Sequence, residues 1–224
     1  SNATTADNVV ATSVSLGEIF RIAVNTVLNE VYFYTGAKIR VVNRATGILS
    51  TLIDLPTPTN GAIPLIGDLL CQHPILYVSD RRNHVVYSVN VVTKAISRVV
   101  GLDTPVIAGD DGAALSTNTR LATIETMVLD RTKKRLYIGQ GHRIRVVDGA
   151  TGVISNFAGT TPGFGGDGGA ATSASFNNIK HLSLDPSASN LYISDSGNNR
   201  VRAIDLATGI VRTVAGTGTA SFSG

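Results

Sequence analysis

The segment from residue 165 to residue 218 is a complete copy of a unit that the rest of the chain repeats in altered form. Within it, short apolar runs at 179–184, 191–194, 201–204 and 210–215 alternate with turns that contain Gly, Asn, Asp or Pro. Short runs rich in Val, Ile, Leu and Tyr are typical of strands, and none of them shows the spacing of an amphipathic helix. The unit is therefore predicted to be a four-stranded antiparallel meander.

The unit recurs along the chain with loops of varying length. The tyrosine of its second run falls at Tyr32, Tyr77, Tyr137 and Tyr192, so the copies are about 45 to 60 residues apart. Four strands at such a period predict a β-propeller rather than a solenoid. We expect an all-β fold in one domain spanning residues 1–224, with four blades at about 11–55, 62–109, 115–159 and 170–216. The second copy departs most, because its start lacks the Gly-Asp-Gly and Ala-Thr-Ser segments that open the fourth.

The sequence leaves two arrangements of these blades open. Each blade is expected to be whole and sequential, and residues 217–224 look like the start of another loop between blades. Either the four blades close on themselves, or the chain is a piece of a larger propeller, which is the arrangement we favour. An open arc would leave blade faces free for self-association.

Composition limits the classes of function. The formal net charge of the 224-residue chain is +3, which is only a weak argument for nucleic-acid binding. Cys71 is the single cysteine, so an intramolecular disulfide is excluded. No apolar run approaches the roughly 20 residues of a membrane span, so we expect no membrane insertion. Tryptophan is absent, which disfavours an aromatic cage as a binding site.

The segments GDGG, ATSAS and LYISDSGNNRVRAID, followed by ATG and TVAGTG, resemble the repeats of NHL-repeat β-propellers. The resemblance covers essentially the whole chain. It implies a propeller that binds partners, among them proteins and RNA, while a minority of related propellers are metal-dependent lyases or hydrolases. It also slightly favours an extracellular or cell-surface location.

A binding site is expected at one end of the blades. In a meander, the turn between the second and third strands lies at the same end as the loop between blades, where Asp7, Asp110, Asp111 and Asp167 occur. Loops on a rigid scaffold are common binding sites. The partner-binding candidates from the second-to-third turns are Arg81, Arg82, Asn83, His84, His142, Arg143, Asp195, Asn199 and Arg200. For Asp195 and Asn199 we favour a structural role, because Asp and Asn stabilise tight turns through their own backbone.

Basic residues recur two positions apart in the third strands, so each pair projects from one side of its strand. If exposed, Lys38, Arg40, Arg145 and Arg202 would form a basic band able to contact the phosphates of RNA. The interpretation that we favour is that the stems cover apolar surface between blades and the charged heads reach water or a carboxylate.

No residue pattern indicates a catalytic site. His84 and His142 align at the same turn position, but a catalytic zinc needs a third protein ligand, and none is identifiable. We therefore expect no catalytic residue, no metal and no cofactor, with a calcium ion held by several blades as the one exception left open. The expected function is a non-enzymatic module, part of a larger protein, that presents its loop end to a macromolecular partner, either a protein, which we favour, or a carbohydrate-bearing surface. RNA binding through the basic band is the first alternative, and a metal-dependent lyase or hydrolase is the second.

Overall fold

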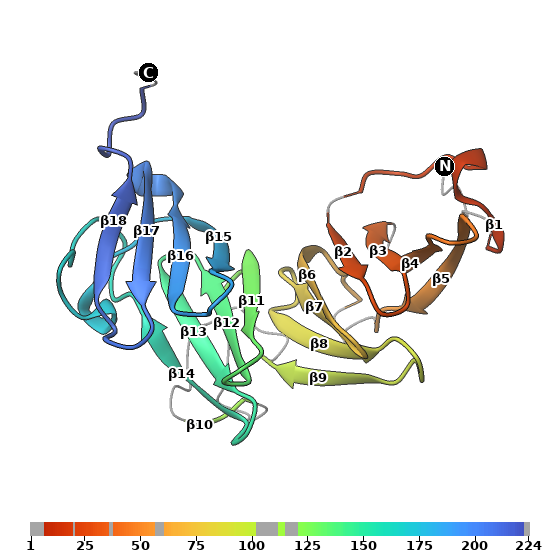
Figure 1. Cartoon of the computed structure of the whole chain (residues 1–224), viewed down its shortest axis with the longest axis horizontal. Helices are drawn as coiled ribbons and strands as arrows, with labels where there is room; N and C mark the ends of the chain where they lie inside the picture. Colours follow the sequence, from red (N-terminus) through yellow and green to blue (C-terminus); the bar gives the residue numbers. More distant parts are fainter. Residues whose placement is uncertain are drawn as a thin grey trace. The chain divides into compact units, whose positions relative to one another are not determined.

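The computed structural model describes residues 7–19, 21–35, 38–56, 61–101, 112–114 and 121–221. Its regular structure consists of antiparallel strands and three single 3-10 turns (Figure 1), namely η1 (Ala11–Ser13), η2 (Ala171–Ser173) and η3 (Ser196–Asn198). Within these ranges, no helix has the length and apolar character that crossing a membrane requires.

The first two meanders have the predicted strand order. Blade 1 comprises β2 (Ile22–Asn25), β3 (Glu30–Thr35), β4 (Lys38–Asn43) and β5 (Ile48–Asp54). Blade 2 comprises β6 (Ile66–Gln72), β7 (Ile75–Asp80), β8 (Val85–Asn90) and β9 (Ile96–Val100). The segment 106–109, in which the sequence suggests a further outer strand, lies outside the described residues.

The other two meanders follow the same order. Blade 3 comprises β11 (Thr126–Asp130), β12 (Arg135–Gln140), β13 (Arg143–Asp148) and β14 (Val153–Ala158). Blade 4 comprises β15 (Ile179–Leu184), β16 (Asn190–Asp195), β17 (Arg200–Asp205) and β18 (Val211–Ala215). These sheets confirm the all-β fold with four-stranded antiparallel blades. Two short strands were not predicted: β1 (Val9–Val10) pairs with β5, and β10 (Gly112–Ala113) pairs with β14.

The chain forms two compact units, Ser1–Val99 and Val100–Gly224, which we call unit 1 and unit 2. Unit 1 contains blade 1 and nearly all of blade 2, and unit 2 contains blades 3 and 4. Within unit 1, β2 lies beside β6, and within unit 2, β15 lies beside β11 and β12 (Figure 1). Neighbouring blades in a unit therefore meet along their first strands.

The two faces of a blade carry different side chains, because successive residues of a strand point to opposite faces. One face, the tyrosine face, carries the repeated tyrosine of the second strand, which is Tyr32 in blade 1, Tyr137 in blade 3 and Tyr192 in blade 4. The opposite face, the arginine face, carries the third-strand residues Arg40, Arg145 and Arg202. The tyrosine face of blade 1 shares one apolar core with blade 2, and that of blade 3 shares one with the arginine face of blade 4.

Every third-to-fourth turn is built in the same way, by an Asx side chain that accepts two backbone N–H groups. The acceptors are Asn43, Asn90, Asp148 and Asp205. The turn ends in a left-handed residue, which is Gly47, Gly152 or Gly209 in three blades and Lys94 in blade 2. Asn and Asp favour such turns because their side chains mimic a backbone carbonyl. This local chemistry accounts for the repeated Ala-Thr-Gly segments.

Gly159→Ala tests whether the glycine that follows β14, the last strand of blade 3, is required for stability. Gly159 has φ +91°, and a Cβ atom there would overlap the carbonyl oxygen of His142. Left-handed strain of about 1 to 2 kcal/mol and displacement of the backbone should together lower the free energy of unfolding by about 3 kcal/mol. Gly152→Ala is the matched control, because Gly152 has φ +69° with open space around it, and only the strain remains. Equal losses in urea unfolding would show that the close approach has no energetic weight.

Candidate functional site

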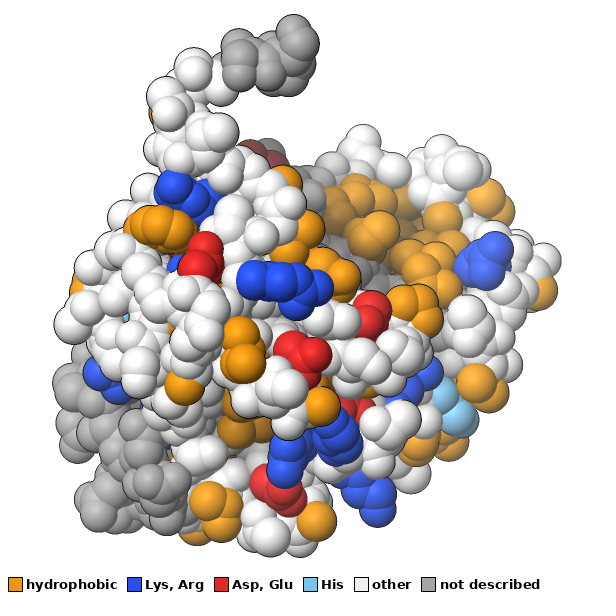
Figure 2. Space-filling model, turned by 60° about the vertical axis from the view of Figure 1, so that its left-hand side comes forward, with side chains coloured by type: hydrophobic (Ala, Val, Ile, Leu, Met, Phe, Trp, Pro, Cys, Tyr) orange, Lys and Arg blue, Asp and Glu red, His pale blue; other side chains and the backbone are white. Residues whose placement is uncertain are grey.

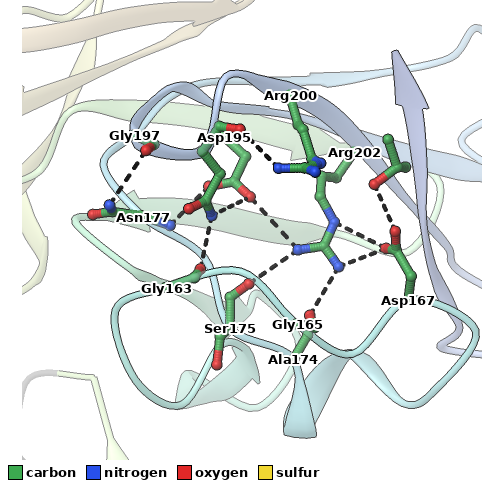
Figure 3. A network of polar contacts seen from close by, with 12 residues as sticks. Gly163, Gly165, Asp167, Ala174, Ser175, Asn177, Asp195, Gly197, Arg200 and Arg202 are labelled. Carbon is green, nitrogen blue, oxygen red and sulfur yellow. Dashed lines mark hydrogen bonds and ion pairs between the residues drawn. The ribbon is translucent and has the colours of Figure 1, made fainter. Parts of the chain in front are cut away.

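The loop end of blade 4 joins the turn between β16 and β17 to the loop that precedes the blade (Figure 3). Asp195, at the end of β16, is buried and accepts hydrogen bonds from the backbone N–H of Asn177 at 2.7 Å and from Nδ2 of Asn198 at 2.8 Å. The same Nδ2 donates to the carbonyl oxygen of Gly163 at 2.7 Å. The second-to-third turn and the loop between blades therefore lie at one end of the blade, as the meander predicts. Asp195 has the structural role that we favoured.

Arg202 connects this end to the loop before the blade. Its side chain is fully buried, and Nη2 lies 2.6 Å from Oδ1 of Asp167. Nη1 donates to the carbonyl oxygen of Ser175 and Nη2 to that of Gly165, both at 3.0 Å, and Nη1 lies 3.5 Å from Oδ2 of Asp195 (Figure 3). A buried guanidinium needs such complete pairing, because desolvation of an unpaired charge is very unfavourable.

Asp167 is held as a carboxylate. Partial burial by itself raises its pKa, but hydrogen bonds from the Thr213 hydroxyl and from Arg202 outweigh burial, and the pKa lies below its ordinary value. The Thr213 hydroxyl is 2.6 Å from Oδ2, and Arg202 reaches Oδ1. Each oxygen of the carboxylate thus has a donor. We refer to Arg202, Asp167 and Thr213 as the arginine clamp of blade 4.

Blade 1 contains the same clamp. Arg40 is buried, its Nη2 lies 3.0 Å from Oδ1 of Asp7, and the Thr51 hydroxyl donates to the same oxygen at 2.9 Å. In blade 3, Arg145 is equally buried, while the loop aspartates Asp110 and Asp111 lie outside the described residues.

Blade 2 differs from the other blades at this position. Tyr87 pairs with Val78 in the register in which Arg202 pairs with Ile193. The sequence of blade 2 also lacks the Gly-Asp-Gly segment that supplies the aspartate in blade 4. Blade 2 therefore lacks both the buried arginine of the third strand and the aspartate of the preceding loop.

The basic band, the interpretation that we did not favour, is wrong for three of its four residues, whereas the heads of Arg40 and Arg202 reach a carboxylate as the favoured interpretation predicts. Arg40, Arg145 and Arg202 are at most 1% exposed, so none of them can contact phosphates in solution. Lys38 is half-exposed but pairs with Asp54 at 2.8 Å. On the face seen in Figure 2, Lys and Arg side chains form separate groups with Asp and Glu side chains among them. The band fails because residues on one side of a strand were assumed to face water, whereas that side faces the loop or the neighbouring blade.

The candidates from the turn of blade 2 divide into buried and accessible residues. Asn83 is buried and donates from its backbone N–H and from Nδ2 to Asp80, so it stabilises the turn. Arg82 is exposed, and its Nη1 donates to the carbonyl oxygen of Ile63 at 2.9 Å. Arg81 and His84 are partly buried, and His84 has φ +58°.

The candidates from the turns of blades 3 and 4 are mostly engaged in their own loops. His142 is half-buried, and burial, followed by the neighbouring charge of Arg143, lowers its pKa. Arg143 donates to the carbonyl oxygen of Thr160. Asn199 is exposed in a left-handed conformation, and its Nδ2 donates to the carbonyl oxygen of Gly218.

The two aligned histidines, His84 and His142, belong to different units. Across the part of the chain that the structure describes, no three His, Cys, Asp or Glu residues form a group that could hold a metal ion.

Phe164 is the functional candidate that sequence reasoning missed. It lies in the Gly-rich loop before blade 4 with 47% of its surface exposed, and the guanidinium carbon of Arg200 is 3.7 Å from the ring centroid. Arg200 is fixed by hydrogen bonds to the carbonyl oxygens of Asn198 and Thr217. The available signal was a lone phenylalanine between two glycines, where turn chemistry alone requires only small residues. The exposed Phe164 of this loop and the partly exposed Arg200 of β17 thus form an aromatic and cationic pair.

Asp167→Asn tests the arginine clamp. Removal of the carboxylate charge leaves Arg202 buried with a weaker acceptor, and breaking a fully buried ion pair costs about 3 to 5 kcal/mol. Because 34% of the Asp167 side chain is exposed, we expect a loss nearer 2 kcal/mol in urea unfolding at pH 7. Asp54→Asn, which removes the carboxylate of the solvent-exposed ion pair between Lys38 and Asp54, serves as the control and should cost less than about 1 kcal/mol. Equal losses would mean that the clamp contributes nothing specific.

The stability of the natural protein and that of Asp167→Asn should depend differently on pH. The pKa of Asp167 is lowered on folding, so its contribution to stability is complete above the unfolded value of about 3.9 and is lost as pH falls through the folded value. The stability difference between the natural protein and Asp167→Asn should therefore be constant from pH 7 to about 5 and shrink below about 4. Unfolding measured across this range checks the sign, and a difference that grows on acidification would contradict it.

Comparison with known proteins agrees with the repeat pattern. No family model matches the chain. The chain is 30% identical over 155 residues to the chloroplastic protein SUPPRESSOR OF QUENCHING 1 of Arabidopsis thaliana, a match covering 63% of this chain and 14% of that protein. It is 27% identical over 138 residues to NHL repeat-containing protein 2 of Bos taurus, covering 59% of this chain and 19% of that protein. The chain thus spans less than a fifth of the length of these curated relatives.

Solved structures show the same fold at low sequence identity. An auxiliary nutrient binding protein of Bacteroides ovatus matches with a TM-score of 0.67 and 20% identity, over 88% of this chain and 48% of that one. A chain of a nidogen/laminin complex matches with a TM-score of 0.62 and 15% identity, over 88% of this chain and 65% of that one. Virginiamycin B lyase of Staphylococcus aureus matches with a TM-score of 0.58 and 13% identity, over 94% of this chain and 58% of that one. The repeats, the four-stranded antiparallel blades and these similarities together support the resemblance of this chain to NHL-repeat β-propellers.

Proposed function

We propose that the chain is a non-enzymatic interaction module that binds a protein partner at the loop end of blade 4. The observation that supports it is the contact between the exposed Phe164, on a loop held in place by the arginine clamp, and the partly exposed Arg200 of β17. Aromatic and arginine side chains are enriched among the residues that dominate the binding energy of protein interfaces. An exposed pair of both kinds is therefore a natural anchor for a partner.

The loop is organised before any partner binds. The carbonyl oxygens of Gly163 and Gly165 accept hydrogen bonds from Asn198 and Arg202, so the backbone on both sides of Phe164 is fixed. The Arg200 side chain is also fixed, by two carbonyl oxygens. Binding to such a surface loses less conformational entropy than binding to a flexible loop.

The fold by itself does not choose between binding and catalysis. The similar structures include an auxiliary nutrient binding protein and a chain of a nidogen/laminin complex, but also a lyase. The proposal therefore rests on the surface of blade 4. The burial of Arg40, Arg145 and Arg202 counts against RNA as the partner, because the cations that would contact phosphates are enclosed by protein.

The experiment compares partners captured by the immobilised natural protein and by three variants. Phe164→Ala and Arg200→Ala each remove one member of the pair. Val92→Ala is the matched control, because Val92 is an exposed apolar residue in the turn between β8 and β9 of blade 2. A partner enriched by the natural protein and by Val92→Ala, but lost by both other variants, is then purified, and its affinity is measured by calorimetry.

For this partner, Phe164→Ala is expected to raise Kd by about 30-fold, since truncation of a principal interface residue costs about 2 kcal/mol. Arg200→Ala should have an effect of similar size, and Val92→Ala should change Kd less than about twofold. Thermal unfolding of each variant checks that the fold is retained. A partner that binds all four proteins equally would contradict the proposed site.

Fluorescence anisotropy with labelled RNA hairpins tests the alternative partner directly. We expect at most weak binding at low salt that disappears at physiological salt, because a few scattered surface cations give only non-specific attraction. Binding that persists at physiological salt and prefers certain sequences would replace the proposed protein partner by RNA.

A further inference from the structure

The arginine face of blade 1 leaves large apolar side chains in contact with solvent. Ile22 and Val24 of β2 are 64% and 47% exposed, and Ile19, just before the strand, is 46% exposed. Isolated surface residues of this kind are ordinary, but three along one short stretch form a patch. The patch therefore requires an explanation.

The equivalent residues of blade 4 are buried. Residues 11–25 of blade 1 align without gaps with residues 171–185 of blade 4, so Ile19 corresponds to Ile179 and Ile22 to Leu182. In blade 4 these two residues are 0% and 2% exposed. The patch thus has the apolar character of a blade interior.

In blade 4, the cover is the tyrosine face of blade 3. The backbone N–H of Leu182 donates to the Thr126 hydroxyl at 3.2 Å, and that of Ile179 to the carbonyl oxygen of Gly141 at 2.7 Å. Tyr137 shares the apolar core with both residues. In unit 1, the first strand of blade 2 is buried in the same way against blade 1, with Leu69 at 5% exposure. Both units thus use a tyrosine face to cover the opposite face of the next blade, which carries Arg202 in blade 4 and Tyr87 in blade 2.

The tyrosine face of blade 4 also leaves an apolar side chain exposed to solvent, that of Val201. Val201 corresponds to Ile39 in blade 1 and Ile144 in blade 3, because each pairs with the residue two positions after the repeated tyrosine. Ile39 and Ile144 are both 0% exposed, whereas Val201 is 40% exposed. Arg212 of β18 is exposed on the tyrosine face of blade 4. On the arginine face of blade 1, Asp7 lies beside β5, paired with Arg40 but still half-exposed.

We propose that the arginine face of blade 1 binds the tyrosine face of blade 4 of a second copy of this chain. The contact repeats the blade-to-blade packing already present twice within the chain, with Ile22 and Val24 on one side and Tyr192 and Val201 on the other. Such an interface uses two different surfaces and is therefore heterologous, joining copies head to tail. This association is independent of the partner site at Phe164.

Sedimentation velocity of the purified chain over a wide range of concentration tests the association. The natural protein should show a mass that rises with concentration. Ile22→Asp and Val201→Asp each place a carboxylate in the interface and should raise the dissociation constant about tenfold or more. Both residues are exposed in one copy, so the fold should tolerate the change. Val92→Asp, an exposed control outside both faces, and Phe164→Ala should associate like the natural protein.

Mixing the two interface variants gives the decisive result. Ile22→Asp retains an intact tyrosine face and Val201→Asp an intact arginine face, so the mixture should form a heterodimer that grows no further. A natural protein that stays monomeric at every concentration would overturn the proposal and assign these faces to another occupant. Association that survives in both single variants, or a mixture that remains monomeric, would equally overturn it.

Discussion

The buried arginine clamp is the interaction on which the loop ends of blades 1 and 4 depend. In blade 4, the guanidinium of Arg202 is enclosed, yet its charge is met by Asp167 and by two backbone carbonyls. Without the loop before the blade, this cation would be buried without its nearest carboxylate, which is a strongly unfavourable state. Blade 2 shows the consequence, since its sequence lacks the aspartate loop and places Tyr87 where the other blades have arginine. The third strand and the loop between blades therefore form one structural element, although they are far apart in sequence.

The clamp also links the fold to the proposed binding surface. It withdraws Arg202 from solvent and fixes the backbone at Gly165, next to the exposed Phe164. Arg200, only two residues away in the same strand, remains partly exposed and lies over the Phe164 ring. One strand thus supplies a structural cation and a surface cation. For this reason the count of basic residues in the sequence indicates little about nucleic-acid binding.

Local chemistry made much of this structure predictable from the sequence. Alternating apolar runs and Asx turns gave the four meanders, and the structural role of Asp195 followed from its place in a tight turn. The burial of Arg202 was harder to predict, because strand periodicity defines the side on which a residue lies but not what covers that side. Phe164 was missed for a related reason: its position depends on Arg200, a contact between residues 36 positions apart that no local pattern encodes.

In a repeat protein, each unit is stabilised mainly by its neighbours, so the character of each blade face indicates what can pack against it. The tyrosine face of blade 4 is partly polar, with Ser183 where blades 1 and 3 have Ala23 and Val128. Blade 1 has no such replacement at Ile22, the counterpart of the buried Leu182. The arginine face of blade 1 thus has the character of a blade interior, while the tyrosine face of blade 4 is partly polar, and a contact between two such faces would be reversible rather than permanent.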